Sequence, residues 1–420
     1  MSNVASQKYF ILHIRAVMPQ QSPQSTSYDV VIIGGAIMGS SAAWFLSDSA
    51  DFSGRILVIE RDPTYQTAGT ALTNSCIRQQ FSTHLNVQIS QFGAEFFQNL
   101  PRYMGNDPRV PQMRIQNYGY MYLANTPEFA EVLRASHRVQ QAAGAATRLM
   151  TAAEIAAEYP FYSTDDLTLG SINTVDEGYF DGNTMFDWLR RSARERGVEY
   201  IENEVVGINK SPDGRRVVSV TLSTGEEVSC GDVINASGTR GAKVAAMAGI
   251  SIPIEPRKRY TWVFTAERPL PRDLPLTIDP SGVHVRQDTK TSYMAGAHSH
   301  IDPAVDFDDF SMDLSMWQDH VWPILATRIP AFESIKVMRE WAGHYDMNTL
   351  DANAIIGPHD AVENFLFMNG FSGHGLQQSP AMGRAVAEWI TLGTYRSLDM
   401  RPLGYARIAR NEPFEELAII

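Results

Sequence analysis

One stretch of sequence decides the fold: YDVVIIGGAIMGSSAAWFLS, residues 28–47. Its apolar beginning, residues 28–33, suits a strand buried in a parallel sheet, and residues 38–47 have helical spacing. A second apolar run, RILVIE at residues 55–60, ends on an acidic residue. Strand, glycine-rich turn, helix and strand in this order predict a βαβ unit that binds a dinucleotide.

The glycine-rich turn at residues 34–39, GGAIMG, departs at one place from the G-x-G-x-x-G fingerprint of dinucleotide sites. Gly34 can make the tight turn, and Gly39 can let helix and strand pack closely. Ala36 takes the position of the second glycine, which costs one methyl group of clearance, while Gly35 beside it keeps the turn flexible. Glu60, about 20 residues further on, can accept hydrogen bonds from ribose hydroxyls and repel a 2′-phosphate. The unit therefore favours FAD or NAD over NADP.

Two further segments favour FAD over NAD. Residues 62–81, DPTYQTAGTALTNSCIRQQF, are polar and lack a helical stripe, whereas a plain NAD domain would continue promptly to its next helix and strand. This loop is expected to return to the cofactor with Thr70, Asn74, Ser75 and Arg78. A second glycine-rich turn, NGFSGHGLQQ at residues 369–378, stands between a strand and a helix whose N–H groups and dipole can face an anion. Two such turns suit a long cofactor held at both ends.

Composition argues against several classes of function. The chain has 420 residues, of which 44% are hydrophobic and 20% charged, so it can build a large core and two domains. Its net charge of −12 argues against binding of nucleic acid or anionic lipid. Cys76 and Cys230 have no metal-ligand spacing, which argues against a disulfide scaffold and a zinc site. No apolar run is long enough to predict a transmembrane segment.

Residues 1–27 contain no acidic residue and are expected to be a frayed, disordered extension, with a transit peptide as the alternative. The two widely spaced cysteines fit a reducing compartment. We therefore expect a cytoplasmic protein, or a protein of the mitochondrial matrix if the source is eukaryotic.

Three motifs carry a resemblance to a known family: RDPTYQTAGTALTNSCIRQQFS at residues 61–82, WAGHYDMNTLDANAIIGPH at 341–359, and FSGHGLQQSPAMGRAVAEWI at 371–390. Through them, and from Tyr28 onward, the chain resembles the D-amino acid oxidase and sarcosine oxidase superfamily of FAD enzymes. Within that superfamily it is similar to the branch of mitochondrial FAD-dependent oxidoreductase-domain proteins linked to assembly of respiratory complex I.

The resemblance implies an α/β fold, in which a Rossmann-like FAD-binding domain is interleaved with an α+β substrate domain built on an antiparallel sheet. The FAD-binding domain would comprise residues 28–108, 165–245 and 340–400, the substrate domain 109–164 and 246–339, and a tail 401–420. The sequence agrees with this arrangement: it predicts a helix over 185–195, one strand within 198–208, and strands over 258–266, 283–287 and 292–298.

The cofactor is expected to be FAD, bound without a covalent link, because the cysteine that holds flavin in some relatives is missing and Gly343 or a neighbour occupies that region. Small residues that end the strand before position 238 would allow close approach. The residues expected to contact FAD are Gly34, Gly35, Ala36, Ile37, Met38, Gly39, Glu60, Arg61, Thr70, Asn74, Ser75, Cys76, Val205, Val206, Ala236, Ser237, Gly238, Gly343, Gly373, His374, Gly375, Leu376 and Gln377.

Six residues are candidates for the substrate site. Arg78 has the two-pronged donor that matches a carboxylate, and relatives use an Arg there for that purpose; a structural ion pair is the alternative. The family pattern places His298 near the substrate amine, and Tyr345 matches an active-site tyrosine of sarcosine oxidases. Tyr260 could form a wall of the pocket, and Arg259 could grip a second carboxylate or line the entrance.

Gln377 is the sixth candidate, because sarcosine-oxidase-like relatives carry a lysine there. They carry another lysine where this chain has Met294. A cation near the flavin helps oxygen to accept electrons, so these departures leave dehydrogenase activity open. His298 and His300 would share a strand face, but without a third ligand we expect no metal site. The glycines around His374 suggest that it shapes the turn.

The function predicted from these residues is FAD-dependent oxidation of the C–N bond of a small amino acid. An N-substituted glycine such as sarcosine or iminodiacetate is the expected substrate, with hydride transfer to flavin N5 and hydrolysis of the resulting imine. The electron acceptor would be oxygen, or a quinone or electron-transfer partner. The alternatives are a D-amino acid dehydrogenase and a non-catalytic FAD protein that acts in assembly of a respiratory complex.

Overall fold

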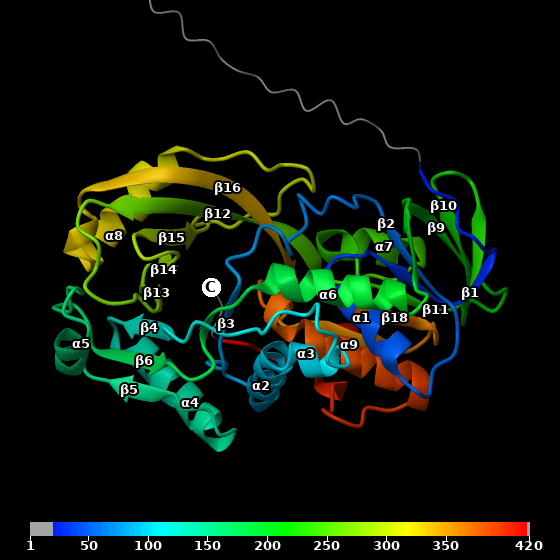
Figure 1. Cartoon of the computed structure of the whole chain (residues 1–420), viewed down its shortest axis with the longest axis horizontal. Coiled ribbons are helices and arrows are strands. Elements are labelled where there is room, and N and C mark those ends of the chain that lie inside the picture. Colours follow the sequence, from blue (N-terminus) through cyan, green and yellow to red (C-terminus); the bar gives the residue numbers. More distant parts are fainter. Residues whose placement is uncertain (1–19, 418–420) are drawn as a thin grey trace, which may run out of the picture.

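The computed structural model describes residues 20–417 and contains two eight-stranded sheets that lie side by side (Figure 1). The strands of the first sheet are β1 (Ser27–Ile33), β2 (Ile56–Glu60), β8 (Glu199–Glu202), β9 (Val205–Lys210), β10 (Val217–Leu222), β11 (Glu227–Asn235), β17 (Ile355–Pro358) and β18 (Phe365–Asn369). The helices around it are α1 (Ile37–Asp48), α2 (His84–Gln98), α3 (Leu100–Tyr103), α6 (Gly182–Glu195), α7 (Gly241–Met247), α9 (Gly375–Leu392) and α10 (Tyr405–Arg410).

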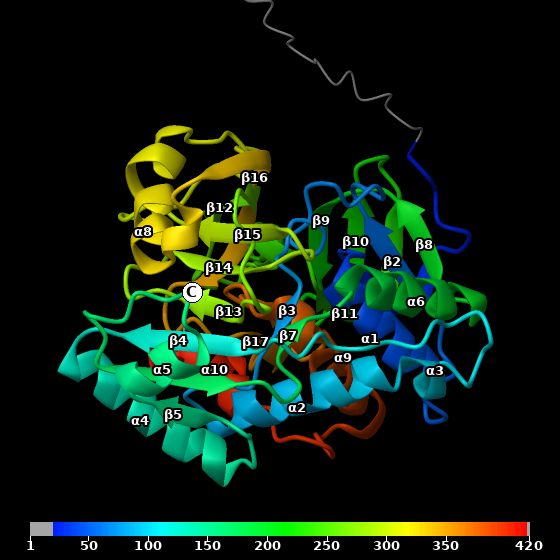
Figure 2. The ribbon, with the colours of Figure 1, turned by 60° about the vertical axis from the view of Figure 1, so that its left-hand side comes forward.

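The second sheet contains β4 (Tyr120–Ala124), β5 (Arg148–Met150), β6 (Leu169–Asn173), β12 (Ile254–Ala266), β13 (Leu276–Ile278), β14 (His284–Gln287), β15 (Ser292–Ala297) and β16 (Ile335–Asn348). Its helices are α4 (Pro127–Ala142), α5 (Ala152–Glu158) and α8 (Trp322–Arg328). A two-stranded sheet, β3 (Cys76–Ile77) and β7 (Gly178–Tyr179), lies between the two large sheets (Figure 2).

The first sheet is the predicted Rossmann-like unit. Its main path runs β17-β18-β11-β1-β2-β8, and β1 pairs in parallel with both β11 and β2. Four residues of β1, Val30–Ile33, are buried on both faces, as a continuous apolar run predicts. Helix α1 packs against α9 and α6, and Ser41 Oγ of α1 donates to Ser379 O of α9 (2.7 Å). The predicted α/β fold is therefore confirmed.

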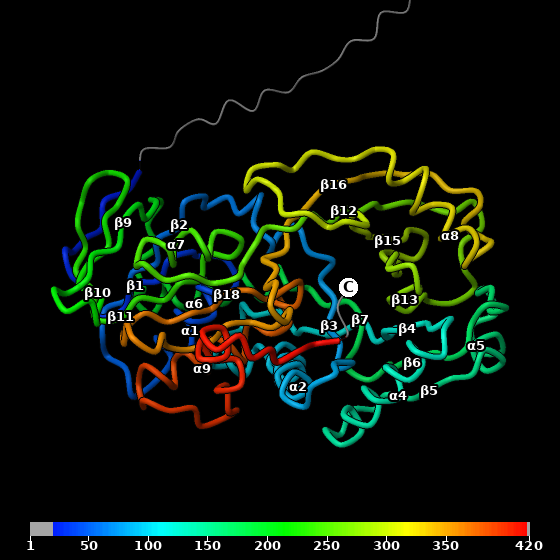
Figure 3. Tube along the Cα trace, turned by 180° about the vertical axis from the view of Figure 1, so that it is seen from behind, coloured from blue at the N-terminus to red at the C-terminus, as the bar shows by residue number. Residues whose placement is uncertain are grey.

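The second sheet is largely antiparallel, in the order β16-β12-β15-β14-β13-β4-β6-β5. Its aromatic core contains Trp262, Phe264, Tyr293 and Phe332, all fully buried. Strands β12 and β16 pair along their whole length, from Ile254↔Asn348 to Ala266↔Ile335. They run as one long ribbon across this part of the molecule (Figures 1 and 3).

The structure differs from the sequence-based predictions at several places. The single strand predicted within residues 198–208 is two strands, because β8 pairs with β2 in the parallel sheet and β9 turns away to pair with β10. Strand β6 lies in the range predicted for the FAD-binding domain, yet it pairs with β4 in the second sheet. Residues 1–19 of the predicted extension lie outside the described range, but residues 20–27 are fixed against β8, where Gln21 N donates to Glu202 O (2.9 Å).

Within residues 20–417, no helix combines the length and the apolar character that crossing a membrane requires.

Candidate functional site

The first glycine-rich turn has the backbone geometry that its sequence predicts. Gly34 has φ of +100°, and a Cβ there would overlap the carbonyl group of Ala236 on the neighbouring strand. A Cβ at Gly39 would overlap the carbonyl oxygen of Gly34. Ala36 precedes α1 with φ of −68°, and its side chain gives the helix no cap. The turn therefore keeps the beginning of α1 close to β1 and leaves room for an anion beside it.

Glu60 stands at the end of β2, beside this turn. Its Oε2 accepts from Gly35 N (2.8 Å) and its Oε1 from Asp62 N (2.7 Å). Burial raises the pKa of Glu60, and these two backbone donors oppose that effect. The carboxylate is thereby fixed where the fingerprint places the ribose of a dinucleotide.

A single large cavity begins at this turn and extends to the second sheet. The predicted residues that line it are Gly34, Ala36, Ile37, Met38, Glu60, Arg61, Thr70, Asn74, Cys76, Arg78, Val205, Ala236, Ser237, Gly238, Arg259, Tyr260, Gly343, Tyr345, Gly373, His374, Gly375, Leu376 and Gln377. Gly35, Gly39 and Ser75 are neighbours of lining residues in the chain without lining the cavity themselves. Val206 does not line it and is 51% exposed, and His298 does not line it either.

The second glycine-rich turn leads from β18 into α9 and is tied to β16. Asp346 accepts from Gly370 N (3.0 Å) and Phe371 N (3.2 Å). Burial raises the pKa of Asp346 to about 6. Gly373 has φ of +92°, and a Cβ there would overlap the ring of Tyr345. Helix α9 begins without a side-chain cap, and its first residues, Gly375–Gln377, line the cavity, so its uncapped N–H groups lie there.

Arg78 is 1% exposed and is held by the surrounding chain. Its guanidinium lies 4.2 Å from the Phe81 ring centroid, and its Nη1 donates to Gln80 O (2.7 Å) and to the Tyr122 hydroxyl. Its Nη2 lies 2.7 Å from His374 Nε2. Because a guanidinium only donates, His374 accepts at Nε2 and carries its proton on Nδ1.

His374 and Gln377 both contact Arg78, and two further facts define their roles. Burial and the charge of Arg78 hold the pKa of His374 well below its usual range, so the imidazole is neutral. Gln377 Oε1 accepts from Arg78 N (2.8 Å) and from Ser90 Oγ (3.2 Å). Both His374 and Gln377 therefore fix Arg78 in place.

Arg259 brings a second guanidinium to the cavity. It pairs with both carboxylate oxygens of Asp302 (2.6 and 3.0 Å) and lies 4.6 Å from the ring centroid of Tyr345. Removal from water raises the pKa of Tyr345, while Arg259 and Arg78 lower it. Tyr345 is therefore close to two positive charges.

His284 is a lining residue that the sequence analysis missed. It is 7% exposed, and Asn74 Nδ2 donates to its Nε2 (2.9 Å). It pairs with Gly296 on β15, where a Cβ would overlap the imidazole. Burial first, then the nearby charges of His298 and Arg259, lower the pKa of His284 to about 3. The sequence did contain a signal for His284, because a histidine stands inside the predicted strand 283–287.

His298 lies just beyond the end of β15, where its Nδ1 is 2.9 Å from Ser299 O. Within residues 20–417, no three His, Cys, Asp or Glu side chains are placed so that they could hold a metal ion.

The residues present fit a bound FAD. The N-termini of α1 and α9 face one cavity, Gly34 and Gly39 make the close cradle for a pyrophosphate, and Glu60 stands at the ribose position. Asn74 Oδ1 is buried in the cavity wall and, within the described residues, has no hydrogen-bond partner from the chain. A polar ligand at this wall would satisfy that acceptor.

Comparisons with known proteins agree with this geometry. The family model described as DAO, FAD dependent oxidoreductase, matches residues 29–389. The chain is 37% identical to FAD-dependent oxidoreductase domain-containing protein 1 of Xenopus laevis, with 93% of this chain and 85% of that protein covered. It is 24% identical to sarcosine oxidase subunit beta of Rhizobium meliloti, with coverage of 89% and 87%.

Among solved structures, L-proline dehydrogenase from P. horikoshii matches with a TM-score of 0.79 at 25% identity, over 92% of this chain and 99% of that one. The predicted resemblance is confirmed, and so is FAD as the cofactor. The two glycine-rich turns, the cavity between them and these matches lead to one conclusion: the chain belongs to the DAO family of FAD-dependent oxidoreductases.

Proposed function

We propose that this oxidoreductase oxidises the C–N bond of a small amino acid, with N-substituted glycines such as sarcosine or iminodiacetate as the substrate class. The observation that carries the proposal is the lining of one cavity by Arg78, Arg259 and Tyr345 together with two neutral imidazoles. Positive charge suits a carboxylate, and the imidazoles of His284 and His374 add no further charge: both are neutral and are held in place by Asn74 and Arg78. The likeness to a sarcosine oxidase subunit supports the same class.

The bound FAD would accept a hydride from the substrate, and the chain would supply position and charge. Arg78 is already bonded to Gln80, Tyr122 and His374, so it acts on the substrate carboxylate mainly as a fixed positive charge. Arg259, anchored by Asp302, can meet a second carboxylate. Holding the substrate in one orientation accounts for much of the rate enhancement of such a reaction.

The amine would be oriented by His284 rather than by His298, because His284 lines the cavity. An imidazole with a pKa of about 3 stays neutral at pH 7 and does not store a proton. We therefore assign it a hydrogen-bonding role. Asn74 fixes the imidazole from the cofactor side of the cavity.

The electron acceptor is proposed to be a quinone or an electron-transfer protein rather than oxygen. Gln377 is uncharged, and its side-chain oxygen is occupied by Arg78 N and Ser90 Oγ. Met294 lies outside the cavity lining, against Arg286 Nη2 (Sδ–N 3.3 Å). Neither residue supplies a cation to the flavin.

Anaerobic titration of the purified, FAD-loaded protein tests the proposal. Sarcosine, iminodiacetate and a panel of D-amino acids would each be added while the visible flavin absorbance is followed. Bleaching by an N-substituted glycine is expected, and slow return of colour in air would indicate a dehydrogenase. Bleaching by D-amino acids alone would favour the D-amino acid dehydrogenase. No bleaching by any compound would contradict catalysis of this kind and favour the non-catalytic FAD protein.

A matched pair of variants then tests Arg259. Arg259→Met should raise the KM for iminodiacetate about tenfold or more, because a charged hydrogen bond is worth about 1.5–3 kcal/mol, and should change the KM for sarcosine much less. Arg339→Met is the control, since Arg339 lies exposed on β16. Equal effects on the two substrates would remove Arg259 from the recognition of a second carboxylate.

A further inference from the structure

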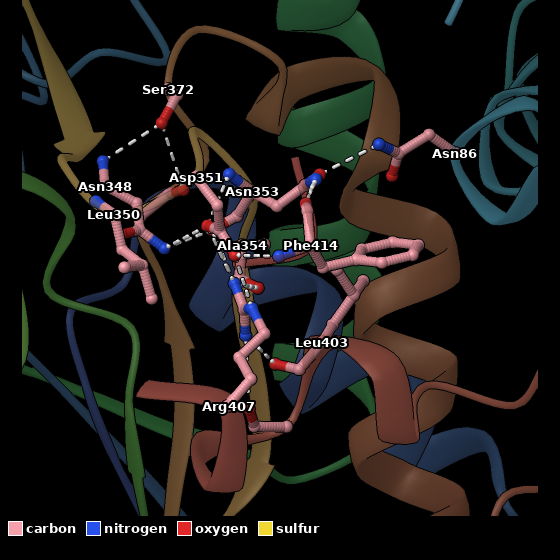
Figure 4. Close-up of polar contacts among 12 residues, drawn as sticks. Asn86, Asn348, Leu350, Asp351, Asn353, Ala354, Ser372, Leu403, Arg407 and Phe414 are labelled. Carbon is pink, nitrogen blue, oxygen red and sulfur yellow. Dashed lines mark hydrogen bonds and ion pairs between the residues drawn. The ribbon is translucent and has the colours of Figure 1, made fainter. Parts of the chain in front are cut away.

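Helix α10 and the chain after it are both bound to the loop that follows β16, the helix through a buried ion pair. Arg407 Nε lies 2.7 Å from Asp351 Oδ2, and both side chains are almost fully buried (Figure 4). Phe414 N donates to the same Asp351 oxygen (3.0 Å), and Phe414 O accepts from Asn353 Nδ2 (2.5 Å). The segment 411–417 is therefore fixed against the loop that follows β16.

This polar network extends in two directions, to Ser372 in the cavity lining and to Asn86 of α2. Asn348, at the end of β16, donates from its N to the Oγ of Ser372, which lines the cavity (3.0 Å) (Figure 4). Asn86 of α2 donates from Nδ2 to Asn353 Oδ1 (2.8 Å) and to Glu416 Oε2 (3.0 Å). The C-terminal segment thus shares its contacts with the second glycine-rich turn and with α2.

Glu416 is a buried carboxylate between two exposed residues. It is 2% exposed, whereas Glu415 and Leu417 are both exposed. Its Oε1 accepts from Ser82 N (2.8 Å), and Leu417 N donates to Ser82 Oγ (2.9 Å). Because a buried carboxylate is costly unless it is well bonded, this contact fixes the loop at Ser82.

The loop that Glu416 fixes is the one that supports Arg78. Phe81 lies under the guanidinium of Arg78 and directly precedes Ser82. Leu417 lines a small second cavity together with Gln80 and Tyr122, the two groups that bind Arg78 Nη1.

The negative charge of Glu416 also acts on Arg78. Burial lowers the pKa of Arg78, but Tyr122, Tyr120, Glu416 and Glu177 raise it by more. Glu416 therefore stabilises the charged form of this fully buried side chain.

We propose that Glu416 is a positioning residue: it holds loop 79–83, and through it Arg78 and His374, at the substrate end of the cavity, so that the segment 411–417 completes the site. This inference rests on the proposed function for its effect on substrate binding. Its effect on the loop does not depend on that function.

Glu416→Gln and Glu415→Gln form a matched pair, because both remove one charge at adjacent positions and only Glu416 is buried. With the FAD-loaded protein, Glu416→Gln should raise the KM for the bleaching substrate about tenfold, which corresponds to about 1.4 kcal/mol, and change kcat by less than about threefold. FAD content should stay that of the wild type. Glu415→Gln should leave KM and kcat unchanged. Equal kinetics of the two variants would overturn the proposal.

Hydrogen–deuterium exchange provides a readout that needs no substrate. Amides of residues 79–83 should exchange faster in Glu416→Gln than in Glu415→Gln, while amides of β1 should not differ. If no compound bleaches the wild-type flavin, the proposed function fails, yet faster exchange of this loop would still support the positioning role. Unchanged exchange of residues 79–83 in Glu416→Gln would overturn the role whatever the substrate is.

Discussion

Ala36 shows how one side chain can depart from a sequence fingerprint without loss of the site. Its φ of −68° is ordinary for any residue, whereas Gly34 two positions earlier has φ of +100°. The second glycine of the fingerprint leaves space for the pyrophosphate and does not need a positive φ, so a single methyl group is tolerated there. The sequence alone identified the turn, but only the backbone angles show which glycines are indispensable.

The two histidines of the second sheet give a prediction at the same scale. His284→Phe should lower kcat/KM about tenfold or more, because it removes the hydrogen bond between Asn74 and the imidazole in the cavity wall while keeping a planar ring. His298→Phe should change kcat/KM by less than about threefold. Steady-state kinetics with the bleaching substrate would measure both. A larger effect at His298 would restore the role that the family resemblance gave it.

Among the elements, strand β12 was the one whose extent the sequence underestimated. Residues 258–266 were predicted as a strand, but β12 begins at Ile254 and includes Pro256. Proline is accepted because the ladder of β12 with β15 begins only at Tyr260. Before it, that side of β12 carries an isolated bridge between Arg257 and Ala304, where Pro256 only accepts a hydrogen bond, from Val305 N (3.0 Å), so no N–H is required of it. Charge and proline obscured the pattern there, whereas the apolar runs of β1 and β2 were easy to recognise.

The crossing of α1 and α9 depends on a glycine. A Cβ at Gly383 would lie 2.7 Å from the carbonyl carbon of Ser41, so the helices would have to move apart. Gly383→Ala should lower the free energy of unfolding by about 1–3 kcal/mol and weaken FAD retention, since α9 and α1 both reach the cofactor cavity. Denaturant unfolding and flavin content would measure this.

Gly207→Ala is the control for that substitution. In β9 a Cβ would meet only Thr221, at an ordinary 3.4 Å. If Gly383→Ala were as stable as Gly207→Ala, the close approach of the two helices would not require a glycine.

For the molecule as a whole, most of the site residues predicted from the sequence line the cavity, whereas the boundaries of the two interleaved domains stay a prediction. What the sequence could not predict is which side chains meet. Arg78 with His374, and Asn74 with His284, are contacts between segments far apart in the chain. The sequence also could not show that His298 lies outside the cavity lining, because this depends on where β15 ends. The strand ends at Ala297, one residue before His298.

Glu177 gives the whole molecule a pH dependence. It is fully buried and accepts hydrogen bonds from Gln79 N, Gln80 Nε2 and Asn173 Nδ2, and burial raises its pKa to about 8. The folded state therefore binds a proton more tightly than the unfolded state, whose pKa is the ordinary 4.5. The stability this group contributes is fully present below pH 4.5 and is lost as the pH rises through about 8.

Glu177→Gln removes that titration. Relative to the wild type, the melting temperature of the variant should rise progressively between about pH 5 and pH 8 and level off above pH 8. Glu340→Gln, on the exposed part of β16, should follow the wild type across the same range. Parallel curves for the wild type and Glu177→Gln would show that Glu177 keeps the same charge throughout.

The bond from Ser82 N to Glu416 joins positions 334 residues apart. During synthesis, the first glycine-rich turn and the loop around Ser82 leave the ribosome long before residues 414–417 exist. The loop around Ser82 therefore gains its bond to Glu416 only after residues 414–417 have been made. A nascent chain halted before residue 414 would carry both glycine-rich turns but lack the carboxylate that holds this loop, so the cofactor turns and the loop would be completed at different moments in the life of the protein.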